Sequence, residues 1–161
     1  MIKTTMTALG MLALAGAAQA GGAKLNSVKQ QVEVETTDGK VYAKVSVDNG
    51  SGVPVFVPKA VFQNAQLFRR EFDIKDMTTR KEVDYIGPMV KRGPLTMKDF
   101  VEIKPGVKRS HSIEITRSYD FKPGKHAYQI SYSGSYLADP AKVEASTPIT
   151  VAPVTFSYPG K

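Results

Sequence analysis

Two histidines, His111 and His126, are the residues whose type could support metal chemistry, because the chain contains no cysteine. Each lies on the same parity as apolar neighbours of an expected strand, so neighbouring strands would bring both rings to one face. Glu102 or Asp120 would then supply a further ligand, as in a zinc site. The alternative is that both histidines are structural, since no HExxH spacing is present. Both interpretations stay open on the sequence alone.

Other catalytic patterns are missing from the sequence. The stretch RSHSIEI, residues 109–115, lacks the glycines of a serine nucleophile elbow. No glycine-rich phosphate loop occurs. Glu33 and Glu35 share the outward parity of one strand, which is typical of a solvated face. We therefore expect a protein that is not an enzyme and that needs no cofactor.

The segment YIGPMVKRGP, residues 85–94, is the strongest candidate for a binding site. Two prolines keep it out of a central strand, and prolines lower the entropy cost of binding because the bound shape already exists. A basic pair offers charge, and the residues around it offer apolar contact. The alternative is a stiff connection between sheets. The candidate partner-binding residues are Tyr85, Pro88, Met89, Val90, Lys91, Arg92, Pro94 and Leu95.

Alternating apolar and polar residues predict the strands that carry these residues. Residues 28–48 alternate on both sides of Asp38-Gly39, the strongest short-range signal of a hairpin. Further strands are expected within the following segments: 53–58, 66–74 (with Phe68, Phe72 and Ile74 on one parity), 80–86, 99–106 (a short strand and a Pro-Gly turn), 109–116, 126–133 and 146–158. LTMKDF, residues 95–100, has room for one helical turn.

This pattern predicts an all-β protein, an antiparallel immunoglobulin-like β-sandwich of about eight short strands. Tyr119 or Phe121 precedes the strand at 126–133, where such sandwiches place a tyrosine that bonds back to the upstream backbone. No repeat, linker or low-complexity tract divides the chain. We expect a single domain over residues 21–161.

The first 20 residues have the three parts of a secretory signal peptide, ending in Ala18-Gln19-Ala20. Their apolar stretch is shorter than the roughly 20 residues that cross a bilayer. We expect an exported protein, periplasmic or extracellular, without a membrane span. The formal net charge of +7 is spread among acidic residues, without the basic run and interleaved aromatics of a nucleic-acid binder. The expected partner is another protein.

Four stretches together resemble one family: VPVFVPKA, LFRREFDI, VDYIGPMVKRGPLTMKDFVEIKPG and IEITRSYDFKPGKHAYQISY. In this order they are similar to the immunoglobulin-like β-sandwich prodomain of bacterial aspzincin metalloendopeptidases, the deuterolysin or peptidyl-Lys group. The resemblance covers roughly residues 30–133. Those enzymes continue into a zinc-binding catalytic domain with HExxH. This sequence ends at Lys161 without that motif, so no catalytic or zinc residue is carried over.

The resemblance implies an exported inhibitor or chaperone that binds a secreted zinc metalloprotease. Because the related proteases prefer lysine at the cleavage point, it also implies that Lys91 enters the substrate pocket. Two alternatives come from other classes of protein. One is a periplasmic metal- or small-molecule-binding protein that uses His111 and His126, and the other is a structural envelope module.

Overall fold

The computed structural model describes residues 27–160, so the expected signal peptide lies outside the described residues. The described chain forms ten strands and two very short helical segments. The elements are β1 (Val28–Thr37), β2 (Lys40–Asn49), β3 (Val55–Pro58), α1 (Lys59–Phe62), β4 (Phe72–Asp76), the 3-10 helix η2 (Met97–Asp99), β5 (Phe100–Ile103), β6 (Lys108–Glu114), β7 (Gly124–Tyr132), β8 (Gly134–Tyr136), β9 (Thr147–Ile149) and β10 (Val154–Gly160).

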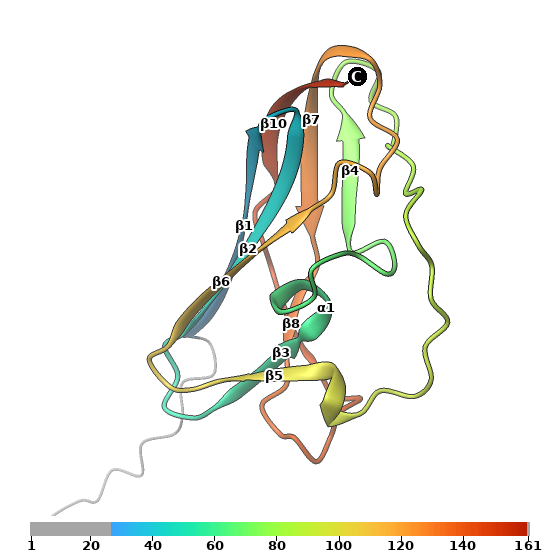
Figure 1. Ribbon diagram of the computed structural model, residues 1–161. Helices are drawn as coiled ribbons and strands as arrows, with labels where there is room; N and C mark the ends of the chain where they lie inside the picture. Colours follow the sequence, from blue (N-terminus) through green and yellow to red (C-terminus); the bar gives the residue numbers. More distant parts are fainter. Residues whose placement is uncertain (1–26, 161) are drawn as a thin grey trace, which may run out of the picture.

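Two three-stranded antiparallel sheets make the body of the molecule, one in the order β1-β2-β6 and the other in the order β10-β7-β4. The pairs β3-β5 and β8-β9 form two smaller sheets, and β3 and β5 lie with α1 towards the end opposite the C-terminus (Figure 1). The prediction of an all-β antiparallel sandwich is confirmed. The strand count is higher than expected because the segment 146–158 contains two strands and β8 was not predicted.

The predicted first hairpin is confirmed in detail. Thr37 pairs with Lys40, so Asp38-Gly39 is a two-residue turn. Both turn residues have positive φ, 51° and 70°, as a type I′ turn requires. On β2 every second residue is fully buried, namely Val41, Ala43, Val45 and Val47. These valines pack in one core with Ile113, Tyr128 and Ile130 of the other strands. Each fully buried side chain of this size contributes about 1.5–3 kcal/mol.

The prediction of strands over 66–74 and 80–86 is largely wrong. Regular pairing begins only at Phe72, and the later segment is held by the isolated bridges Lys75↔Glu82 and Tyr85↔Tyr119. Phe68 was expected to share one face with Phe72 and Ile74. Instead Leu67 is buried and Phe68 is 38% exposed. A shift of one residue moves a side chain to the opposite face. Phe68 is therefore a surface residue.

The expected helical turn in LTMKDF is confirmed as η2. The Thr96 N–H donates to Asp99 Oδ2 over 2.9 Å, which makes a capping box at the start of this turn. No helix among the described residues has the length and apolar composition needed to cross a membrane.

Candidate functional site

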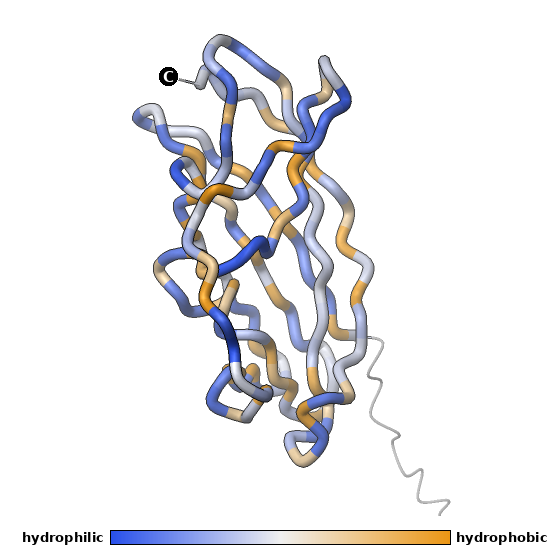
Figure 2. The backbone as a smooth tube through the Cα atoms, turned by 90° about the vertical axis from the view of Figure 1, so that its right-hand side faces the viewer, coloured by the Kyte–Doolittle hydropathy of each residue, from blue (hydrophilic) through white to orange (hydrophobic). Residues whose placement is uncertain are grey.

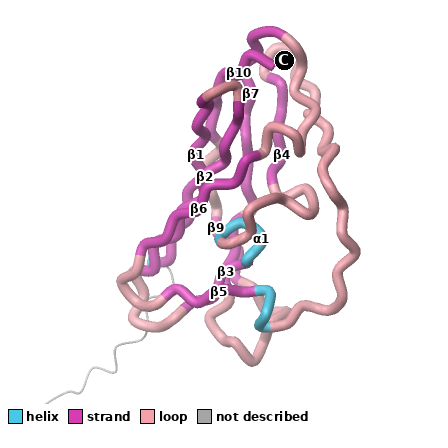
Figure 3. Tube along the Cα trace, in the orientation of Figure 1, coloured by secondary structure: helices cyan, strands magenta, loops and turns pink. Residues whose placement is uncertain are grey.

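The segment from Tyr85 to Leu95, here called the recognition loop, connects the end of the β4 region to η2. It contains no regular helix or strand, and it runs along one side of the molecule as a long loop (Figure 3). Figure 2 turns this side towards the viewer, and orange and blue stretches alternate along it. The predicted candidate residues all lie on this one segment.

The first residues of the recognition loop are fixed to the body of the protein. The N–H groups of Ile86 and Gly87 both donate to the Ser118 carbonyl, at 2.9 and 3.2 Å. The Tyr85 hydroxyl donates to the Pro88 carbonyl at 2.8 Å. A side chain at Gly87 would begin only 2.6 Å from that hydroxyl oxygen. A side chain at this position would therefore force the Tyr85 ring or the loop to shift.

Tyr119 supports this anchored end from within the core. Its hydroxyl donates to the Phe72 carbonyl at 2.7 Å and accepts from the Phe72 N–H at 3.1 Å. Burial raises the pKa of Tyr119 far above the ordinary value, so the phenol stays protonated and can donate. The Tyr85 ring packs edge-on against Tyr119, with the ring centroids 5.4 Å apart. The predicted tyrosine bond to the upstream backbone is thus confirmed for Tyr119. Tyr85 is half-buried and positions the loop.

On the anchored end and beyond it, large apolar side chains point into solvent. Met89 is 79% exposed, Ile86 61% and Val90 57%. The Val90 N–H donates to the Phe68 carbonyl at 3.0 Å, which brings the exposed Phe68 beside the loop. We call Phe68, Ile86, Met89 and Val90 the apolar patch. Single exposed apolar residues are ordinary, but three on one short segment, with Phe68 bonded beside it, are typical of an interaction site.

The basic pair follows the apolar patch directly. Lys91 and Arg92 are exposed, and no salt bridge joins either of them to an acid within residues 27–160. By contrast, the nearby Arg69 pairs with Glu71 at 2.6 Å. Hydrogen bonds from Thr96, and also the charge of Arg92, lower the pKa of Asp99, so Arg92 already acts on an acid of the protein, whereas Lys91 does not pair with one in the described part of the chain. Pro94 is exposed as well, and Leu95 is half-buried where the loop returns to the body.

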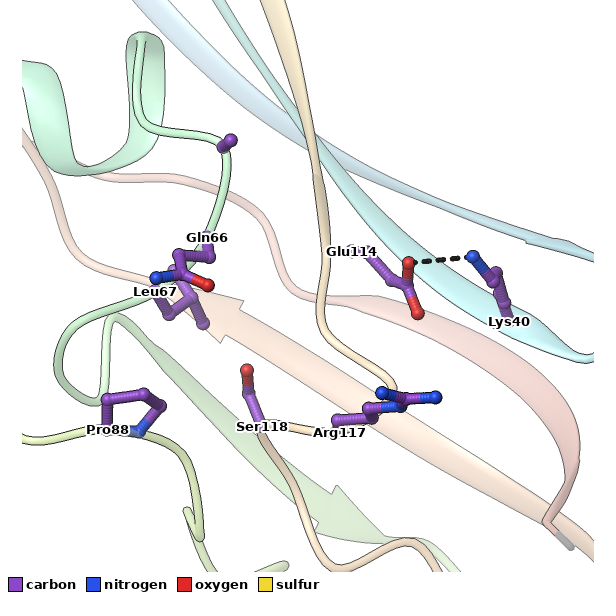
Figure 4. Close-up of a pocket in the computed structure, with 8 residues that line it drawn as sticks. Lys40, Gln66, Leu67, Pro88, Glu114, Arg117 and Ser118 are labelled. Atoms are coloured by element: carbon purple, nitrogen blue, oxygen red, sulfur yellow. Dashed lines mark hydrogen bonds and ion pairs between the residues drawn. The ribbon is translucent and has the colours of Figure 1, made fainter.

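Two hollows of about 360 and 350 Å³ adjoin the anchored end. Pro88 lines the first and Ile86 the second. Three residues line both hollows and therefore lie between them: Lys40, Glu114 and Arg117. Figure 4 shows the first hollow, with Ser118 between Pro88 and Arg117. The loop and the residues around Arg117 therefore form one continuous surface.

No family model matches this chain, and no curated protein matches it. The link to metalloendopeptidase prodomains therefore stays a prediction from the sequence motifs.

The two histidines do not lie on neighbouring strands, so the expectation that adjacent strands bring both rings to one face is wrong. His111 belongs to β6, which pairs with β2, whereas His126 belongs to β7, which pairs with β4 and β10. His111 Nε2 lies 2.7 Å from the Asn64 carbonyl oxygen. No group of three or more metal-binding side chains occurs among the described residues.

His126 has a structural setting of its own. Its Nδ1 lies 2.9 Å from Asp76 Oδ2, and its Nε2 lies 3.1 Å from the Pro123 carbonyl oxygen. The Asp76 carboxylate also accepts from the N–H groups of Thr78 and Thr79. These bonds, with that of Thr79 foremost, lower the pKa of Asp76 below its ordinary value. The cluster fixes the turn after β4.

The sequence interpretation missed residues that the fold adds to the recognition loop. Phe68 was placed on one strand parity with Phe72 and Ile74, and Ile86 was placed in a strand. Arg117 and Ser118 come from a segment about 30 residues later in the chain. Their only sequence signal is their place directly after the strand that ends at Glu114, where loops begin.

Proposed function

We infer that this protein is a non-catalytic protein-binding domain that presents the recognition loop to another protein. The observation that carries this proposal is the exposure of Met89 (79%) on a segment whose neighbouring N–H groups are bonded to the body. A preformed loop loses little conformational freedom when it binds. Loops on a rigid β-framework are the usual place for recognition.

The chemistry of the loop defines the surface that it would fit. Apolar side chains at the centre of an interface supply most of the binding energy, and surrounding polar groups supply orientation. Met89 and Val90 would take the central role, since methionine adapts to irregular apolar surfaces. Lys91 and Arg92 would face acidic groups at the rim. The expected partner therefore has an apolar depression with acidic groups beside it.

The more specific proposal is that the partner is a secreted zinc metalloprotease, which this domain inhibits or helps to fold. Its support is the sequence resemblance together with the exposure of Lys91, which makes no salt bridge among the described residues. If Lys91 enters a substrate pocket, Lys91→Ala will abolish inhibition of that protease. Unchanged inhibition by Lys91→Ala would remove the pocket role from this residue.

The experiment that tests the proposed function is capture of a partner by the protein without its expected signal peptide, residues 21–161. The bait is offered to secreted and periplasmic proteins of its source, and captured protease activity is assayed. The loop variant is Met89→Ser with Val90→Ser. A matched control is Met77→Ser with Val107→Ser, which removes apolar side chains that are 43% and 41% exposed elsewhere. The proposal expects loss of the partner only with the loop variant.

A further inference from the structure

The first hollow beside the recognition loop has a wall of fixed residues from distant parts of the chain. Lys40 begins β2, Glu114 ends β6, Leu67 comes from the segment before β4 and Pro88 from the loop. Arg117 and Ser118, together with Ala65 and Gln66, complete this lining (Figure 4). The fold therefore gathers donors here that no sequence motif places together.

Ser118 is the least expected member of this lining. It is only 8% exposed, and in Figure 4 its hydroxyl points into the hollow. Its main chain is fixed, because its N–H donates to the Ile115 carbonyl and its carbonyl accepts from the loop. Among the described residues the hydroxyl has no hydrogen-bond partner. The hydroxyl is not one of the fully buried unpartnered atoms, so it is open to the hollow and can donate to a ligand there.

The charge of the hollow is positive. Lys40 Nζ and Glu114 Oε2 lie 3.0 Å apart, so these two charges largely cancel each other. The Arg117 guanidinium has no carboxylate partner within residues 27–160. Glu114 would repel an incoming anion, but its carboxylate is already held by Lys40. One net positive charge therefore remains, beside a serine hydroxyl that can donate.

We propose that this hollow receives a carboxylate side chain, aspartate or glutamate, of the protein that the recognition loop binds. A guanidinium offers two parallel N–H donors that match the two oxygens of a carboxylate. The Ser118 hydroxyl donates a further hydrogen bond from the buried wall. Because Pro88 lines the same hollow, an acidic residue beside the partner's apolar contact reaches Arg117. This inference rests on the proposed function.

The test uses the isolated protein and a capped glutamate, with acetylated N-terminus and amidated C-terminus, as the probe. Nuclear magnetic resonance follows the Arg117 Nε–H and the Ser118 amide during titration. The proposal expects saturable shifts of both signals with glutamate and none with capped glutamine. Arg117→Gln will weaken this binding about tenfold, as expected for loss of a charge-assisted hydrogen bond. Arg80→Gln, at an exposed arginine on a distant turn, will leave it unchanged.

Two results would overturn the proposal. One is no saturable shift with capped glutamate, and the other is equally tight binding of inorganic phosphate, which would make the hollow a general anion site. Partner capture separates this inference from the proposed function. If Met89→Ser with Val90→Ser loses the partner while Arg117→Gln keeps it undiminished, the loop binds protein and the acid-receiving role is wrong.

Discussion

The anchored and exposed parts of the recognition loop follow opposite rules within a few residues of each other. At the anchored end, the Tyr85 hydroxyl, the N–H groups of Ile86 and Gly87 and the Tyr119 hydroxyl all have partners. Farther along, Met89 places an apolar side chain almost entirely in water. The hydrogen bonds of the anchored end contribute to folding stability, whereas the exposed Met89 side chain does not. An exposed apolar segment held in a fixed position is typical of an interaction site.

The largest expected change in stability comes from Tyr119→Phe. Removing the hydroxyl leaves the Phe72 N–H and carbonyl without a partner in the core. We expect the free energy of unfolding to fall by about 3 kcal/mol. Chemical denaturation monitored by fluorescence or circular dichroism measures this loss.

Tyr132→Phe is the matched control for this change. Tyr132 is also buried, at 7% exposed, but its hydroxyl makes no hydrogen bond among the described residues. We expect its removal to change stability by less than about 0.5 kcal/mol. Equal losses in both variants would contradict the role given to the Tyr119 hydroxyl.

Gly87→Ala tests the junction between the two parts. The new methyl group would begin 2.6 Å from the Tyr85 hydroxyl oxygen and 2.7 Å from the ring carbon that carries it, so the ring or the loop must move. We expect a loss of about 1–2 kcal/mol in unfolding free energy and a displaced loop. Gly93→Ala is the control, because nothing lies within 4 Å of a side chain added there. Similar partner binding by both variants would show that the loop position does not matter.

The stability of the protein should also depend on acid, through Asp76 in the turn after β4. Its pKa is lowered in the folded protein, so its contribution is complete above the unfolded value of about 3.9 and is lost as the pH falls through the folded pKa. Thermal unfolding measured between pH 6 and pH 2 should show this loss. Asp76→Asn should flatten the curve below pH 4, and an unchanged slope in the variant would contradict the assignment.

The smallest change in stability is expected for the exposed part of the loop. Met89→Ser with Val90→Ser replaces side chains that water already surrounds, so unfolding free energy should change by less than about 0.5 kcal/mol. Denaturation under the conditions used for Tyr119→Phe checks this. A loss of more than about 1 kcal/mol would mean that these side chains support the fold, and the contrast between the two parts would fail.

The sequence predicted those features that depend on neighbouring residues. Alternating valines and Asp38-Gly39 specify the first hairpin, and prolines keep the segment 85–94 out of a sheet. Features that depend on distant contacts were not predictable. Phe68 is turned outward by the burial of Leu67, and Ser118 reaches the loop only through the arrangement of the sheets. The prediction that neighbouring strands bring both histidine rings to one face was wrong for the same reason, because the order of the strands decides which residues are neighbours.

The central claim is that the exposed apolar side chains of the recognition loop bind a protein. The most direct measurement compares partner capture by the unchanged protein, by Met89→Ser with Val90→Ser, and by Met77→Ser with Val107→Ser, all confirmed as folded. The account predicts that the loop variant alone loses the partner, with any protease inhibition lost alongside. Undiminished capture by the loop variant would contradict it.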